Sequence, residues 1–133
     1  MGVFGKTYKL CSRKTIDLLF KEGKQMRSFP FVVYWKEATL TEAVPFQLVF
    51  SAPKRSFRRA HDRNKIKRLL RETFRNKKEN LELILQEQQK QVALFVIYAH
   101  KEELPFAELL VHTEKLITKL STEIKNNSNN ATN

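Results

Sequence analysis

One segment of this chain, residues 53–78, combines a dense positive charge with a helical apolar pattern. It holds twelve Lys or Arg against two acids, Asp62 and Glu72, a local balance of +10 in a chain whose net charge is +11. The apolar residues of its later part recur at i, i+3, i+4 and i+8, the spacing of one helical face: Ile66, Leu69, Leu70 and Phe74. The segment therefore predicts an amphipathic helix from about residue 60, with one face on a core.

The polar residues of this predicted helix fall beside its apolar face. At about 100° per residue, six of them occupy an arc of roughly 140°. They are Arg63, Asn64, Lys67, Arg68, Arg71 and Arg75. So many neighbouring cations repel one another unless phosphates or counterions approach. We expect a structured polyanion as the partner, and a merely solvated basic face is the competing interpretation.

Length and composition favour one folded domain. The chain has 133 residues, 41% apolar residues and fourteen aromatics, ten of them Phe, which a disordered basic tail would lack. The positive charge favours nucleic acid or an anionic membrane surface, and no apolar run is long enough to suggest a membrane span. The first residues lack the apolar stretch of a secretory signal, so we expect a cytoplasmic protein.

The single cysteine, Cys11, excludes an intrachain disulfide and a thiolate metal cluster. Its place beside Leu10 at the start of a helix favours small apolar packing over a nucleophilic role.

The first third of the chain predicts an arm, a helix and a strand. Residues 1–10 indicate a loosely ordered arm. Ser12 is a candidate N-cap for a short helix that ends at Gly23 and carries Ile16, Leu19 and Phe20 on one face. Residues 28–36 alternate as a strand, with Phe29, Phe31, Val33 and Trp35 on one face. Pro30 in this segment indicates an edge position or a strand start.

The rest of the chain predicts two more strands and two helical segments. Residues 37–44 indicate a hairpin loop before a strand at 45–52. Residues 80–89 either extend the basic helix or form a separate turn, and residues 91–99 predict a strand well inside the sheet. Pro105 suits the first turn of a last helix, and the polar residues 126–133 suggest a disordered tail. We therefore expect an α+β domain over residues 11–125.

The run Arg63-Asn64-Lys65-Ile66-Lys67-Arg68, with Arg71 three positions on, resembles the signature helix of the bacterial ribonuclease P protein family. The end of the first predicted helix, Phe20-Lys21-Glu22-Gly23, matches a second family feature. The resemblance covers roughly residues 8 to 122. Lys65 stands where the family has Arg, and Ile16 stands where the family often has Phe. Lys keeps the charge but lacks the planar fork of Arg.

This resemblance implies a fold that the periodicity alone does not. The family has a single small α+β domain in the order helix, strands, basic helix, strand, helix. Its mixed sheet contains an unusual left-handed βαβ crossover in a ribosomal-protein-like fold. Periodicity alone would favour a right-handed crossover, since nearly all parallel crossovers are right-handed.

The resemblance also implies a function. Ribonuclease P is an endonuclease that hydrolyses one phosphodiester bond to remove the 5′ leader of precursor tRNA. Its catalyst is an RNA, magnesium is held mainly by that RNA, and the protein is an accessory subunit that is expected to be inactive alone. The implied partners are the catalytic RNA and precursor tRNA in the cytoplasm, with no membrane and no obligate protein partner.

The resemblance assigns residues to two surfaces and none to catalysis or metal binding. The expected contacts with RNA are Lys54, Arg55, Arg58, Arg59, Arg63, Asn64, Lys65, Lys67, Arg68, Arg71 and Arg75. The expected leader-binding cleft contains Ser12, Ile16, Phe20 and Tyr34. The sequence pattern likewise suggests no catalytic or metal site, because the carboxylates are scattered and the three histidines lack metal-ligand spacing.

Two other functions use the same basic helix. A ribosomal or assembly protein would bind structured RNA without a leader cleft. A self-sufficient nuclease or a DNA-binding helix module would need no RNA partner, although the nuclease would need a carboxylate cluster that the sequence does not suggest.

Overall fold

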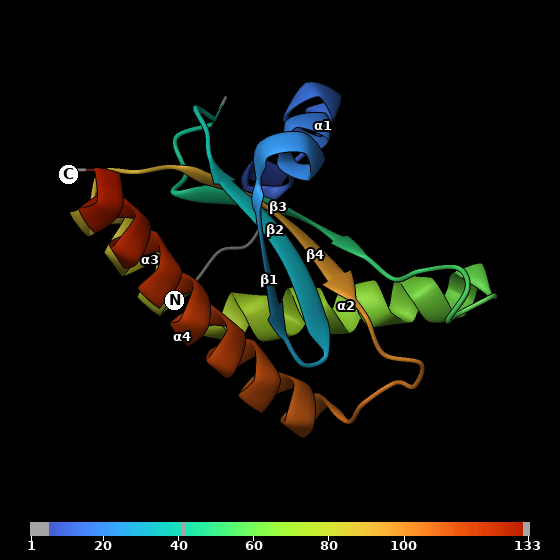
Figure 1. Ribbon diagram of the computed structural model, residues 1–133. Coiled ribbons are helices and arrows are strands. Elements are labelled where there is room, and N and C mark those ends of the chain that lie inside the picture. The colour runs from blue at the N-terminus through green and yellow to red at the C-terminus, as the bar shows by residue number, and fades with distance from the viewer. Residues whose placement is uncertain (1–5, 41, 132–133) are drawn as a thin grey trace.

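The computed structural model describes residues 6–40 and 42–131, with side chains described for residues 7–40 and 42–126 (Figure 1). A short 3-10 turn η1 (Lys6–Tyr8) precedes helix α1 (Arg13–Glu22) and the strands β1 (Lys24–Ser28), β2 (Phe31–Glu37) and β3 (Phe46–Ser51). Helices α2 (Ala60–Lys77) and α3 (Glu79–Glu87), strand β4 (Val92–Tyr98) and helix α4 (Phe106–Ala131) complete the chain. None of the helices within these ranges is long and apolar enough to cross a lipid bilayer.

The four strands form one mixed sheet in the order β1-β2-β4-β3. β1 pairs with β2 and β2 with β4 in antiparallel fashion, whereas β3 runs parallel to β4. The predicted α+β class is therefore confirmed, with α2 and α3 forming the crossover between the two parallel strands. The left-handedness of this crossover stays a prediction of the family resemblance.

Alternation along the strands divides the sheet into two different faces. Phe31, Val33 and Trp35 of β2 are each 1% exposed and belong to the main core with residues of α2, α3 and α4. The opposite face carries a smaller buried cluster, in which Leu19 of α1 lies with Ala93 of β4. Figure 1 shows this arrangement, with α1 apart from the other three helices. The face beside α1 is only partly covered.

Two of the strand predictions were wrong. The strand predicted at residues 28–36 is interrupted, because Phe29 and Pro30 form the turn between β1 and β2. β1 escaped prediction because its sequence KQMRS contains one apolar residue, Met26, and so shows no alternation. The predicted hairpin between the second and third strands does not exist, since β4 lies between β2 and β3. No pattern within either strand reveals a neighbour that follows only after two helices.

The chain ends also differ from the expectation. Residues 6–10 are not a loose arm, because Leu10 is buried and its backbone amide donates to the carbonyl oxygen of Leu48 at 3.0 Å. Residues 126–131, expected to be disordered, continue α4. Residues 1–5, 132 and 133 lie outside the described residues. Cys11, expected to pack as a small apolar residue, is exposed.

A buried ion pair joins η1 to the junction between α2 and α3. Lys78 separates the two helices, so residues 79–87 form a helix of their own. The Lys78 ammonium lies 2.7 Å from a Glu82 carboxylate oxygen and 5.0 Å from the centre of the Tyr8 ring. The Tyr8 hydroxyl donates to the other Glu82 oxygen. Burial first, and then this hydrogen bond, raises the pKa of Tyr8 to about 12. Lys78 is therefore a structural cation.

We predict that Lys78→Met lowers the free energy of unfolding by about 3 kcal/mol, because its loss leaves the largely buried Glu82 carboxylate without a cation and with only the Tyr8 hydroxyl as a partner. Lys77→Met is the matched control. The Lys77 ammonium lies 3.5 Å from Glu114 in a largely exposed pair, whose loss costs about 1 kcal/mol or less. Urea unfolding of both variants measures the difference, and equal losses would contradict a structural role specific to Lys78.

Candidate nucleic-acid interface

The α2 helix is held by the apolar stripe that its sequence predicts. Ile66, Leu70 and Phe74 are at most 1% exposed, and Leu69 is partly buried against the same core. The helix packs on α4 and β3. Burial of each such side chain contributes about 1.5–3 kcal/mol, so the rotation of α2 about its axis is fixed. Its polar arc consequently faces away from the core.

A buried polar contact also joins α2 to α4, and sequence reasoning missed it. The Thr113 hydroxyl donates to the Thr73 hydroxyl at 2.9 Å, and Thr73 donates to the carbonyl oxygen of Leu70 at 2.9 Å. Both threonines are fully buried. Because a buried hydroxyl without a partner costs about 1–3 kcal/mol, the pair favours one register of α2 on α4. No signal in either helix marks a threonine as half of such a pair.

Most of the predicted RNA-contacting residues are exposed and have no intramolecular partner. We call these residues the α2 cationic surface. Its members are Lys54, Arg55, Arg58 and Arg59 in the loop before α2 and Asn64, Arg68 and Arg71 on the helix. Within the part of the chain that the structure describes, none of these side chains forms an ion pair or a hydrogen bond. Lys67 lies beside this surface and is half-buried.

The remaining predicted contacts have partners within the protein. Lys65 lies 3.3 Å from the Glu103 carboxylate, in the loop before α4. Arg75 lies 2.5 Å from Glu72 on its own helix. The hydrogen bond from Arg75 is the main cause that lowers the pKa of the exposed Glu72 carboxyl. Phosphates must compete with these two carboxylates, so Lys65 and Arg75 are less available than Arg68 and Arg71.

Arg63 has a role that the motif did not indicate. Its Nη1 atom donates to the carbonyl oxygens of Phe57 and Arg58, both at 2.9 Å. Within the same loop, the backbone amides of Ser56 and Phe57 donate to the carbonyl oxygen of Pro53. Arg63 therefore holds the loop that carries four cations of the α2 cationic surface. A sequence motif shows which residues are charged, but it does not show which carbonyl groups they reach.

A second candidate surface contains aromatic rings on the sheet face beside α1. Phe20 of α1 is 48% exposed, although α1 packs on the sheet through Leu19. Its ring centre is 4.8 Å from that of Tyr34 on β2 and 4.8 Å from that of Phe95 on β4. We call these three residues the aromatic patch. It presents ring surface to solvent and is backed by the sheet.

The other predicted leader contacts lie around this patch. Ile16 is half-buried in the small cluster under α1. Ser12 is the N-cap of α1, where its hydroxyl accepts from the backbone amide of Thr15 at 3.2 Å. Phe95 was not predicted, because the strand at 91–99 was expected to lie well inside the sheet. The alternation of this strand, with Phe95 and Ile97 on the opposite face from Leu94 and Val96, was the available signal.

The sheet register connects the aromatic patch to the α2 cationic surface. Tyr34 pairs with Phe95, and two residues further Val32 pairs with Ile97. Ile97 in turn pairs with Ser51, the last residue of β3. Two residues of a strand span about 7 Å, so this half-buried row leads from the patch to the basic loop after β3. An extended chain of a few nucleotides could follow such a path.

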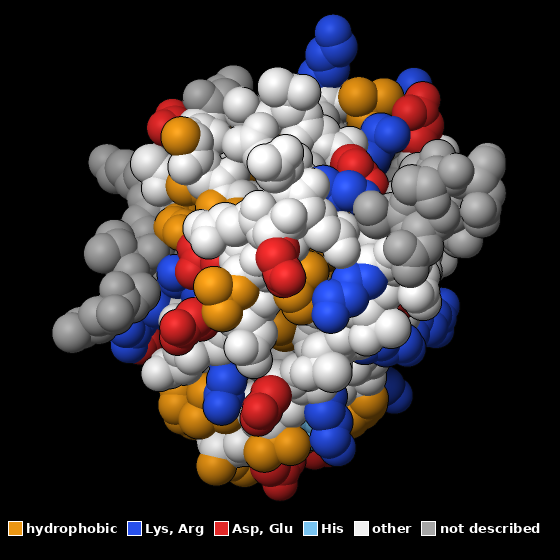
Figure 2. Space-filling model, turned by 90° about the vertical axis from the view of Figure 1, so that its left-hand side faces the viewer, with side chains coloured by type: hydrophobic (Ala, Val, Ile, Leu, Met, Phe, Trp, Pro, Cys, Tyr) orange, Lys and Arg blue, Asp and Glu red, His pale blue; other side chains and the backbone are white. Residues whose placement is uncertain are grey.

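Another face of the protein carries charges of both signs. Figure 2 shows a face on which Lys and Arg alternate with Asp and Glu.

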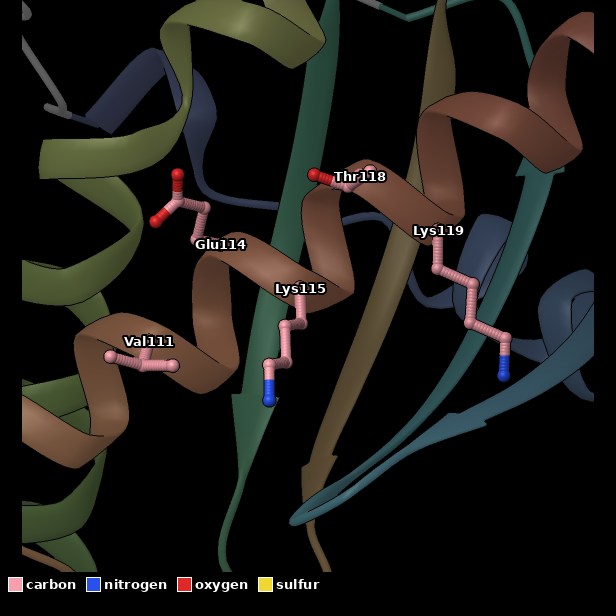
Figure 3. Close-up of a pocket in the computed structure, with 5 residues that line it drawn as sticks. All are labelled: Val111, Glu114, Lys115, Thr118 and Lys119. Atoms are coloured by element: carbon pink, nitrogen blue, oxygen red, sulfur yellow. The ribbon is translucent and has the colours of Figure 1, made fainter.

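A shallow open depression of about 480 Å³ lies on the outer side of α4 (Figure 3). It is lined by Val111, Glu114, Lys115, Thr118 and Lys119, none of which belongs to a predicted site. Among the residues with described side chains, no group of three or more His, Cys, Asp and Glu is placed to hold a metal ion.

Comparisons with known proteins agree on one family. The Ribonuclease P family model matches residues 4–121. A ribonuclease P protein component of Porphyromonas gingivalis is 35% identical over 102 residues, which cover 75% of this chain and 72% of the relative. One of Thermotoga maritima is 35% identical over 75 residues, or 56% of this chain and 61% of the relative.

Solved structures show the same fold. The ribonuclease P protein of Staphylococcus aureus superposes with a TM-score of 0.62 at 22% identity, covering 87% of this chain and 96% of that chain. A structure of the Thermotoga maritima ribonuclease P protein gives a TM-score of 0.57 at 27% identity, covering 81% and 94%.

We predict that replacing Arg68 and Arg71 together by Ala weakens binding to a structured RNA and reduces the slope of log K against log salt by about 2, since each phosphate contact contributes about 1. Arg75→Ala is the matched control, because Glu72 already neutralises Arg75. Filter binding at several salt concentrations measures both slopes. A slope equal to that of the unmodified protein would remove Arg68 and Arg71 from the phosphate-binding set.

Proposed function

Because this chain belongs to the ribonuclease P protein family, we propose that it binds the catalytic RNA of that enzyme through the α2 cationic surface and the 5′ leader of precursor tRNA through the aromatic patch. Family membership makes the chain a protein component of an endoribonuclease that acts with an RNA subunit in tRNA 5′ processing. The particular RNA contacts and the leader contact are the proposal, and the cytoplasm is its expected place of action.

The α2 cationic surface supports the contact with the catalytic RNA. Its cations are exposed and have no carboxylate partner among the described side chains. The helix that carries two of them and follows the loop with the other four is fixed by Ile66, Leu70 and Phe74. Phosphates that approach relieve the repulsion between these cations and release counterions, which makes binding strong at low salt and weak at high salt. Such contacts position an RNA without reading its bases.

The aromatic patch supports the contact with the leader. Unpaired bases stack on exposed aromatic rings with about 1–3 kcal/mol per base and with little sequence preference. Phe20 and Tyr34 offer such rings, and Phe95 supports Phe20 from β4. The neighbouring row of Val32, Ile97 and Ser51 would let the leader backbone reach the basic loop. Leaders of different sequence could therefore bind in the same way.

The protein has a binding role rather than a chemical one in this proposal. The scissile phosphodiester bond is hydrolysed at the RNA, which would hold the magnesium ions that the reaction uses. The described residues of this chain hold the leader and the RNA in a fixed relation, and such positioning lowers the entropic cost of bringing substrate and catalyst together. No residue of this chain is assigned to the transfer of a proton or to metal binding.

The observation that carries the proposal is the register that joins the two surfaces. A ribosomal or assembly protein would use α2 alone, and it would have no need for an exposed aromatic patch that a half-buried row of sheet residues joins to the end of β3. A contact that spans both surfaces suits a substrate with a single-stranded extension next to a structured RNA.

We predict that Phe20→Ala weakens binding of leader-bearing precursor tRNA to the assembled enzyme by about 5- to 150-fold, the equivalent of 1–3 kcal/mol for one stacked base. Binding of mature tRNA, which has no leader, should change little. Leu83→Ala is the control, because Leu83 is a similarly exposed apolar residue on α3. Equal losses for precursor and mature tRNA would show that Phe20 is a packing residue and would contradict the leader contact.

A further inference from the structure

A second exposed phenylalanine, Phe29, has surroundings that resemble those of Phe20. Phe29 lies in the turn between β1 and β2 and is 58% exposed. Its ring centre is 5.1 Å from that of His100 and 5.3 Å from that of His112, both in edge-to-face geometry. Each of the two phenylalanines is thus held by two flanking rings and still presents ring surface to solvent. Phe20 is a residue of α1, whereas Phe29 contacts α4 through His112.

The position of Phe29 is fixed by three segments that are far apart in the chain. Ser28 pairs with Phe31 across the turn, and the amide of Ala99 donates to the carbonyl oxygen of Pro30 at 2.7 Å. The flanking rings come from the loop after β4 and from the first half of α4. An exposed ring with such support loses little freedom when a ligand stacks on it, and binding to a preorganised ring is correspondingly stronger.

A row of rings connects Phe29 to the loop of the α2 cationic surface. Phe57, in that loop, has its ring centre 5.9 Å from that of Tyr98. Tyr98 is in turn 6.3 Å from His100, which contacts Phe29. The same loop is held by Arg63. Phe29 and the loop that carries Arg58 and Arg59 are therefore linked through the buried ring of Tyr98.

Charges of both signs lie in the segments around Phe29, where the Lys119 ammonium also donates to the carbonyl oxygen of Arg27. Arg27 and Lys101 are exposed cations in the neighbouring segments, and Glu102 and Glu108 are exposed acids. Glu103 is already paired with Lys65. We therefore expect RNA to contact this surface mainly by stacking a base on the ring of Phe29.

We propose that Phe29, supported by His100 and His112, is a stacking site for an unpaired base of the RNA that the α2 cationic surface binds. This inference rests on the proposed function, because it needs that RNA as the partner. It adds a base contact on the α4 side of the sheet to the leader contact on the α1 side. A protein with both sites would hold the catalytic RNA and the leader by separate aromatic contacts.

The test compares Phe29→Leu and Phe29→Tyr in binding to a bacterial ribonuclease P RNA without any tRNA. Leu keeps an apolar side chain but removes the flat ring, whereas Tyr keeps the ring. We expect Phe29→Leu to weaken binding by about 5- to 150-fold, with an unchanged salt slope, and Phe29→Tyr to bind nearly as the unmodified protein. Thermal unfolding of both variants serves as the control for folding.

A second measurement keeps the proposal testable if Phe29→Leu folds poorly. In Phe29→Trp, the indole replaces the ring at the exposed site, and its fluorescence should fall when the same RNA is added, because a stacked base quenches it. Trp35 is 1% exposed and contributes a constant background. Unchanged fluorescence, or equal affinities of the Leu and Tyr variants, would overturn the stacking site. Loss of affinity only for leader-bearing precursor tRNA would overturn the choice of partner.

The Phe29 stacking site and the proposed function can fail independently of each other. If the unmodified protein binds the RNA with a salt slope that depends on Arg68 and Arg71, the proposed function stands whatever Phe29 does. If the unmodified protein fails to bind this RNA, the proposed function fails first.

Discussion

The packing of α2 is the constraint on which the rest of the structure depends. One side of this helix is buried against α4 and β3 through Ile66, Leu70 and Phe74. The cations on the opposite side are therefore exposed to solvent. The buried threonine pair on α2 and α4 favours one register for that packing. Without this core, the crowded cations would have no fixed geometry and could not match the phosphates of a structured RNA.

Much of this fold could be predicted from the sequence, because its longest elements have clear periodicity. The amphipathic α2, the apolar β4 and the start of the last helix after Pro105 were all predicted correctly. Short or polar elements were not, since β1 has a single apolar residue and gives no alternation. Strand order was also missed, because the pairing of β4 between β2 and β3 is a long-range contact that depends on the packing of α2 and α3.

For the candidate site, the sequence predicted which residues are charged or aromatic, but not which residues they contact. The charged and aromatic residues were identified from their pattern and from the family resemblance, and their roles in RNA binding stay predictions. What could not be predicted is how the protein itself uses them. Arg63 holds a loop, Lys65 and Arg75 have carboxylate partners, and Phe95 completes the aromatic patch. Each of these facts depends on distances between elements that only the folded chain defines.

We propose that this protein helps an RNA catalyst to remove the leader of precursor tRNA. The most direct measurement combines the purified protein with a bacterial ribonuclease P RNA at a magnesium concentration too low for the RNA alone, and follows release of the 5′ leader. We expect cleavage only when protein and RNA are both present. Binding of the RNA without any change in cleavage or in affinity for precursor tRNA would contradict it.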